Sequence, residues 1–297
     1  MNKQIACGSN HTVAIIDNSI ICWGNNSRNQ CDIIIDNAFS VSCGILFTAI
    51  LTTEGAILCQ GYNMQGQCNV PRVHQFMSVS CGGLFSSALT TDNKVVCWGD
   101  NVFGQCDVPP DVKHVIYINS GYEHVAVITG DNLVRCWGRN NSKQCNVPDN
   151  IINAHSVACG AKHTVAIINK EKQVVCWGDN SMHQCLPPPG LINIISIACG
   201  NFHTVALTSD HAVICWGYNY WKQCNVPTNL PDIYDICAGH NYTTVITNEG
   251  KIICWGNNSA SQCNTHLSLT DNRCSPHLLK NASSAAGSAP VTESFGI

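Results

Sequence analysis

The amino-acid sequence predicts an all-β fold, a seven-bladed β-propeller closed into a ring. The main observation is a ten-residue pattern, C-W-G-x-N-x-x-x-Q-C, whose copies begin 37 to 40 residues apart. Near-fixed spacing of this length indicates a repeat protein in which each unit is one supersecondary element. Each unit also holds three short apolar segments separated by polar turns, which is typical of a small antiparallel sheet. The seven copies open at Cys22, Cys59, Cys97, Cys136, Cys176, Cys215 and Cys254, and the tryptophan is replaced only once, by Gln60.

The fifth unit shows the strands that we expect in every blade. Residues 155–160 alternate and end at a glycine, residues 163–168 form a β-branched run, and residues 173–177 follow a polar turn. A polar loop and a proline-containing exit come next. We expect these exits to be a short fourth, outer strand, where proline costs no ladder hydrogen bond. The exits are Val70-Pro71, Val108-Pro109, Val147-Pro148 and Val226-Pro227.

The ends of the chain are expected to close the ring. An open row of units would leave a hydrophobic face at each end, whereas radial closure buries both faces. The first unit lacks the lead-in of the others, so we expect residues 1–8 to complete a blade whose other strands come from about residue 251 onward. N- and C-terminal strands would then pair. We place the propeller in residues 1–270 and a low-complexity tail in residues 271–297.

Composition argues against several classes of partner. The net charge is −4, and the 15 Lys and Arg residues form no basic run, so no nucleic-acid partner is expected. No stretch reaches the roughly 18 apolar residues of a membrane-spanning helix, so no membrane association is expected. Met1-Asn2-Lys3-Gln4 leads directly into repeat sequence, which predicts that there is no signal peptide.

Each ten-residue stretch begins and ends with cysteine, and the two recur together in all seven units. If the loop between them turns the chain back, the sulfurs would meet, and each disulfide would stabilise the fold by roughly 2–3 kcal/mol. The alternative is that cysteine is a small buried hydrophobic residue here, which the missing signal peptide favours. The candidate disulfides are Cys22–Cys31, Cys59–Cys68, Cys97–Cys106, Cys136–Cys145, Cys176–Cys185, Cys215–Cys224 and Cys254–Cys263.

The histidines and cysteines do not form the pattern of a metal or catalytic site. Cys159, Cys176, Cys185 and His163 would suit zinc by residue type. However, the position three residues after the first-strand glycine holds His, Phe or Tyr, and a packing position accepts that exchange whereas a ligand position does not. We therefore expect no metal, no cofactor and no enzymatic activity. This ring column reads His11, Phe47, Phe85, His124, His163, His203 and Tyr242.

Function is expected in two sets of loops where the units differ. One set lies between the Asn and Gln of each ten-residue stretch, and the other follows the first-strand glycine. Exposed aromatic and methionine side chains of this kind anchor protein interfaces. The alternative is that they contact neighbouring blades. The candidate partner-binding residues are Met64, Phe103, Tyr122, Glu123, Met182, Phe202, Tyr218, Tyr220, Trp221 and Lys222.

One unit carries a clear family resemblance. The run Ile197-Ala198-Cys199-Gly200-x-x-His203-Thr204-Val205-Ala206-Leu207, followed by Cys215-Trp216-Gly217-x-Asn219, resembles the repeat of the regulator of chromosome condensation family. The resemblance covers residues 1 to about 263 and implies a seven-bladed propeller. The founding member is a nucleotide-exchange factor for a nuclear GTPase, with longer blades and an inserted wedge. The short blades here are more similar to a branch that includes a secreted bacterial inhibitor of β-lactamases, a protein-binding propeller.

Resemblance and loops together predict a non-enzymatic scaffold for protein–protein interaction that uses one rim of the ring. Its partner would be another protein. One alternative is a guanine-nucleotide exchange factor for a small GTPase, which the uniform blade length disfavours. Another is a disulfide-stabilised structural or virion protein, because the Asn- and Ile-rich composition looks like the repeat proteins of giant viruses of amoebae. The expected location is the cytoplasm or a virion.

Overall fold

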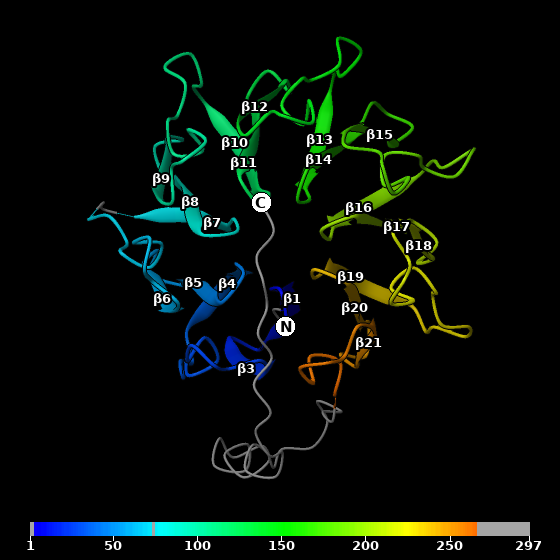
Figure 1. The fold of residues 1–297 in the computed structure, drawn as a ribbon, viewed down its shortest axis with the longest axis horizontal. Coiled ribbons are helices and arrows are strands. Elements are labelled where there is room, and N and C mark those ends of the chain that lie inside the picture. The colour runs from blue at the N-terminus through cyan, green and yellow to red at the C-terminus, as the bar shows by residue number, and fades with distance from the viewer. Residues whose placement is uncertain (1–2, 73–74, 266–297) are drawn as a thin grey trace.

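Seven small sheets surround a common axis in this protein (Figure 1). The computed structural model describes residues 3–72 and 75–265, and over these it contains strands, turns and loops but no helix. Each sheet is antiparallel, has three strands and uses consecutive stretches of chain. The predicted all-β, seven-bladed propeller is therefore confirmed. The predicted boundary at residue 270 and the tail at 271–297 lie outside the described residues.

The strands of each blade follow one another in sequence, and successive first strands contact each other around the axis. The first strands are β1 (Lys3–Cys7), β4 (Ala38–Cys43), β7 (Phe76–Cys81), β10 (Val115–Ser120), β13 (Ala154–Cys159), β16 (Ile194–Cys199) and β19 (Ile233–Ala238). The second strands are β2 (His11–Ile16), β5 (Phe47–Thr52), β8 (Phe85–Thr90), β11 (His124–Thr129), β14 (His163–Ile168), β17 (His203–Thr208) and β20 (Tyr242–Thr247). The third strands are β3 (Ser19–Gly24), β6 (Ile57–Gly61), β9 (Val95–Gly99), β12 (Val134–Gly138), β15 (Gln173–Gly178), β18 (Val213–Gly217) and β21 (Ile252–Gly256).

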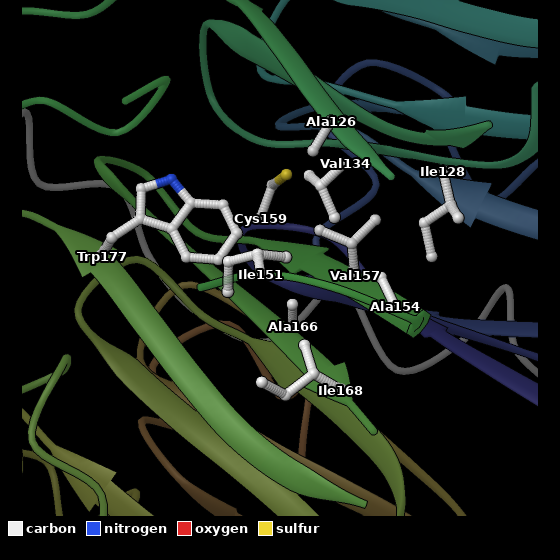
Figure 2. Close-up of a cluster of buried hydrophobic side chains, with 10 residues drawn as sticks. All are labelled: Ala126, Ile128, Val134, Ile151, Ala154, Val157, Cys159, Ala166, Ile168 and Trp177. Atoms are coloured by element: carbon white, nitrogen blue, oxygen red, sulfur yellow. The ribbon is translucent and has the colours of Figure 1, made fainter. Parts of the chain in front are cut away.

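The hydrophobic core is divided among the spaces between blades. Every residue of β14 is buried, because both faces of this middle strand meet a neighbouring blade. Figure 2 shows one such space, where Ala126 and Ile128 of blade four meet Val157 and Trp177 of blade five. Two-sided burial explains why the second strands read as continuous β-branched runs instead of alternating with polar residues. No described segment forms a helix of the kind that crosses a bilayer.

The glycine after each first strand is required because the side-chain ring three residues later packs directly over it. A Cβ at Gly160 would overlap the imidazole of His163, and one at Gly44 would overlap the ring of Phe47. The same conflict recurs at Gly239 with the ring of Tyr242. The recurring glycine and the ring column are thus two halves of one packing arrangement.

Side-chain contacts between blades one and seven join the two ends of the described chain, and the expected pairing of N- and C-terminal strands is not among its strand pairs. β1 pairs with β2, so residues 3–7 are the first strand of blade one, and the expectation that residues 1–8 complete the last blade is wrong. Blade one is instead joined to blade seven by hydrogen bonds. Trp23 Nε1 and Thr12 Oγ1 both donate to the carbonyl of Gln262, over 2.9 and 3.2 Å. Tyr242 donates its hydroxyl to His11 O over 2.6 Å.

The expected fourth strand is also wrong, since each described sheet has three strands. Immediately after the last cysteine of a stretch the chain turns tightly, and Val70 N donates to Cys68 O over 3.0 Å. The same bond joins Val108 to Cys106. These valine amides are used locally, so they cannot enter a ladder. Their side chains instead contact the cores between blades.

Replacing Gly160 by alanine tests the packing of the His163 side chain over this glycine. The added Cβ would overlap the His163 ring and lie 2.7 Å from the backbone oxygen of Gly200, so we expect a loss of about 2 kcal/mol or more in the free energy of unfolding. Urea denaturation measures it. Gly130→Ala is the matched control, because the nearest atom there is 3.5 Å away. Equal stability of the two variants would show that the ring does not require the glycine.

Candidate functional site

Both sets of candidate loops lie on the same rim of the propeller. In each blade the end of the third strand lies beside the start of the second, as in the register pair His203–Gly217. The first residue after the third strand then donates its amide to the loop after the first strand. Tyr218 N donates to Phe202 O and Arg139 N to Glu123 O, each over 2.8 Å. We call this end of the molecule the loop rim, and the opposite end, where second strands turn into third strands, the turn rim.

Each loop between cysteines has the same internal hydrogen bonds. In blade three, Asn101 Oδ1 accepts from Cys106 N over 2.7 Å, and Gln105 Oε1 accepts from Phe103 N over 2.9 Å. Asn101 Nδ2 also donates to Asp107, and an Asn or Asp stands at the corresponding place in every blade except the fifth, which has Leu186. The recurring Asn therefore holds the turn of each loop. The acceptor after the last cysteine was visible in the sequence but overlooked.

Four of the candidate residues form one aromatic group on blade six. The rings of Phe202 and Tyr218 meet edge-on at 6.5 Å, Tyr218 and Tyr220 stack at 6.3 Å, and Tyr220 meets Trp221 at 5.2 Å. Tyr220 is 74% exposed and Trp221 43% exposed. We call these four residues the aromatic group. Lys222 follows it and is exposed as well.

A second cluster joins blades three and four. Arg139 forms an ion pair with Glu123 over 2.5 Å, and its guanidinium lies 4.6 Å from the centre of the Phe103 ring. The charges of this pair are about four-fifths buried. Phe103 and Glu123 are thus brought together, as candidate residues for one surface, by an arginine that the sequence analysis did not single out.

The remaining candidates lie apart from these clusters. Met64 is 78% exposed and Met182 43% exposed, each on the loop of its own blade. Tyr122 lies near the axis, where its ring is 6.0 Å from that of His240. Tyr122 and His240 line an axial cavity of about 80 Å³. Tyr122 therefore lies at the axial channel, away from the outer part of the rim.

The fold and the loops agree with known proteins at the level of the repeat. The sequence profile of the regulator of chromosome condensation (RCC1) repeat matches residues 3–30, 78–105, 115–144, 154–184, 194–220 and 233–262, more than half of the chain. The chain belongs to this repeat family. The second unit, which carries Gln60 in place of the tryptophan, falls outside the matched residues. No curated protein matches the chain.

Solved structures show the same propeller at low sequence identity. The ectodomain of the receptor kinase CR4 from Physcomitrella patens is 21% identical, with a TM-score of 0.74 over 85% of this chain and 72% of that one. The ectodomain of ACR4 from Arabidopsis thaliana is 22% identical, with a TM-score of 0.72 over 86% and 95%. Prp20p of Saccharomyces cerevisiae, described with its binding to Gsp1p and histones, is 17% identical, with a TM-score of 0.50 over 86% and 72%. At these identities the likeness concerns the fold alone.

The histidines of the ring column are buried structural residues of the RCC1-repeat propeller. His163 is fully buried, and its Nε2 lies 3.1 Å from Thr204 Oγ1 of the next blade. His124 and His203 make the same contact with the threonine of the following blade. Burial lowers the pKa of His163 to about 3, so the ring is neutral at pH 7. Over residues 3–72 and 75–265, no three His, Cys, Asp or Glu side chains are placed to hold a metal ion.

The seven cysteine pairs adopt three states. Disulfides join Cys22 to Cys31 and Cys254 to Cys263, and the sulfurs of Cys59 and Cys68 lie 3.0 Å apart. The sulfurs of the other four pairs are not bonded to each other. In these four pairs, burial raises the pKa of the second cysteine, as for Cys106, to about 12. The Asn and Gln hydrogen bonds shape the loop in every blade, with or without the disulfide.

The buried histidines predict that acid destabilises the protein. Five of them, His11, His124, His163, His203 and His240, have pKa values of about 3 to 4, below the ordinary 6.5. A group whose pKa is lowered by folding contributes stability above its unfolded value, and this is lost as pH falls from about 6.5 toward 4. Asp235, whose pKa burial raises to about 6, acts in the opposite direction but is a single group. We expect the melting temperature to fall steadily from pH 7 to pH 4.

A double variant isolates one histidine. His163→Phe with Thr204→Val recreates the pairing of Phe85 with Val125 found elsewhere in this chain, and it should reduce the acid dependence of the melting temperature while preserving the fold. The measurement is thermal unfolding across the pH range in both proteins. An identical pH dependence in the two would mean that His163 is not a source of the acid sensitivity.

Proposed function

We propose that this propeller is a non-enzymatic scaffold that binds another protein through its loop rim. The observation that supports this most is the aromatic group, in which Tyr220 and Trp221 are exposed although each contacts a neighbouring ring. Tyrosine and tryptophan are enriched among residues that dominate binding energy. Their contacts hold them in place before a partner arrives, so little side-chain entropy would be lost on binding.

The surroundings of the aromatic group also suit a protein partner. Within the group, Phe202 contacts Tyr218 and Tyr218 stacks on the exposed Tyr220, and Lys222 adds a positive charge next to Trp221. An interface with an aromatic centre and a charged rim is the common arrangement in protein complexes. The binding of Gsp1p and histones described for Prp20p shows that a propeller of this fold can bind proteins. The alternative function is nucleotide exchange on a small GTPase. If the protein accelerated nucleotide release from any member of a panel of small GTPases, that function would take the place of our proposal.

Converting the blade-six loop to the blade-seven sequence tests the proposal. Ser259 and Ala260 occupy in blade seven the positions of Tyr220 and Trp221, so Tyr220→Ser with Trp221→Ala fits the same backbone. We expect the melting temperature to change little and binding of proteins captured from the native host to weaken by about tenfold or more. Quantitative affinity purification measures the difference.

The matched control changes an equally exposed residue away from the aromatic group. Met64 lies on the loop of blade two and is 78% exposed, so Met64→Ser is the control variant. If the captured proteins are lost equally with Met64→Ser and with the blade-six double variant, the aromatic group is not the anchor. Capture that neither variant changes would place the partner on a different surface.

We also propose that all seven cysteine pairs are disulfides in the mature protein. In support, two pairs are bonded and the sulfurs of a third lie 3.0 Å apart on equivalent loops. Thiol alkylation of protein from its native source, under denaturing and non-reducing conditions, should leave Cys97, Cys106, Cys176 and Cys185 unlabelled, whereas Cys43 and Cys159 become labelled. Labelling of both members of each pair would identify an ordinary reduced propeller.

A virion location and a giant-virus origin are predictions that proteomics of purified particles would check.

A further inference from the structure

A ring of side chains surrounds the axis at the turn rim. Six first strands have a shift in register at the same place near the start of the strand, and one residue lies within each shift. Blade one shows no shift over its described residues and places Lys3 there. The residues at these shifts are Phe39, Met77, Ile116, His155, Ile195 and Tyr234. We call these six residues the collar.

The apolar collar residues are exposed although their neighbours are not. Met77 is 45%, Ile116 51%, Ile195 42% and Tyr234 50% exposed, whereas the residue before each of them is almost fully buried. A β-bulge re-aims a side chain, and bulges are common beside functional sites. The core does not require an apolar residue at these positions, so its recurrence around the ring points to a surface role.

A cavity lies beside the collar. It has a volume of about 430 Å³ and is lined by Lys3, Gln4, Phe39, Ser40, Tyr234 and Asp235 of three first strands. The ammonium group of Lys3 lies 5.9 Å from the centre of the Tyr234 ring. An aromatic member of the collar therefore already accepts a cation from this chain.

Carboxylates outnumber cations in the turns at this end of the molecule, where seven acidic residues stand against Lys94, Lys170, Lys172 and Lys251, and Lys94 pairs with Asp92. The turn between second and third strands carries one acidic residue in every blade: Asp17, Glu54, Asp92, Asp131, Glu171, Asp210 and Glu249. On the loop rim, by contrast, acidic and basic residues are equal in number. Those residues are Asp32, Asp100, Asp107, Glu123 and Asp179 against Arg28, Arg139, Lys143, Lys162 and Lys222. The net charge of −4 therefore does not come from the loop rim, and a positively charged partner would be drawn to the turn rim.

We propose that the collar and the turn carboxylates form a second docking site, for an extended protein segment in which lysine or arginine stands next to bulky apolar residues. Apolar side chains of that segment contact Met77, Ile116 and Ile195, and its cations pair with the turn carboxylates. This surface is separate from the loop rim, so the two sites allow the propeller to hold two partners at once.

Fluorescence polarisation with defined peptides tests the site. The probe is a labelled peptide in which lysine alternates with phenylalanine or leucine, and the controls replace lysine by glutamate or the apolar residues by serine. We expect the probe to bind at least about tenfold more tightly than either control, with an affinity that falls as salt rises. Equal binding of all three peptides, or no binding of the probe, overturns the proposal on the unmodified protein alone.

Variants then locate the site. Met77→Ser with Ile116→Ser and Ile195→Ser should weaken probe binding by about tenfold or more, and Glu54→Gln with Asp131→Asn and Asp210→Asn should flatten its salt dependence. The loop-rim double variant Tyr220→Ser with Trp221→Ala should bind the probe as before. Probe binding that is lost in the loop-rim variant instead overturns the proposal. Self-association in sedimentation that the collar variant abolishes would identify a second copy of the chain as the occupant, which also overturns it.

Discussion

The ring depends on hydrogen bonds between neighbouring blades, which the backbone carbonyl of the buried glutamine in each blade accepts. At Gln67, Gln184, Gln223 and Gln262 it accepts both the indole N–H and a hydroxyl of the next blade. The other three glutamines accept one of the two. Each hydrogen bond contributes about 1 kcal/mol net to the free energy of unfolding. Where blade seven meets blade one, Gln262 accepts both of these hydrogen bonds. The seam is therefore like the joints between sequential blades, and no terminal blade needs a special cap.

A second contact between blades explains the exchange of His, Phe and Tyr in the ring column. Each of the four histidines lies within hydrogen-bonding distance of a threonine of the next blade, whereas Phe85 faces Val125, which has no hydroxyl. Both polar groups are therefore absent at Phe85, whereas the partner position of Phe47 holds Ser86, whose hydroxyl donates to Gln67 O. Sequence reasoning recognised the packing role but not the partner, because the two residues are about one full repeat apart and become neighbours only when blades stack.

The sequence predicted most of what is local, but it failed at the exits of the blades and where blades meet. The period, the three strands of each blade and the loops of the candidate site were readable from short stretches of chain, whereas the expected fourth strand does not form. The closing seam was not, because residues 3–7 look the same whether they pair with β2 or with the last blade. The collar escaped notice because a bulge changes the face on which a residue lies, so the period-two pattern assigns Ile116 and Ile195 wrongly.

Backbone hydrogen bonds join successive blades at both ends of the axis, and the two ends differ in the side chains that they expose. On the loop rim, a relay of backbone hydrogen bonds from Ile45 to Gly83 and from Gly83 to Tyr122 links successive first-strand loops. Tyr122 and His240 narrow the channel at this level. The aromatic group is thus attached to loops that are bonded to one another, which favours a preorganised interface. At the turn rim Ala38 N donates to Asn18 O and Ala154 N to Asn132 O, but the first strands begin with bulges there, and the side chains at these bulges are exposed.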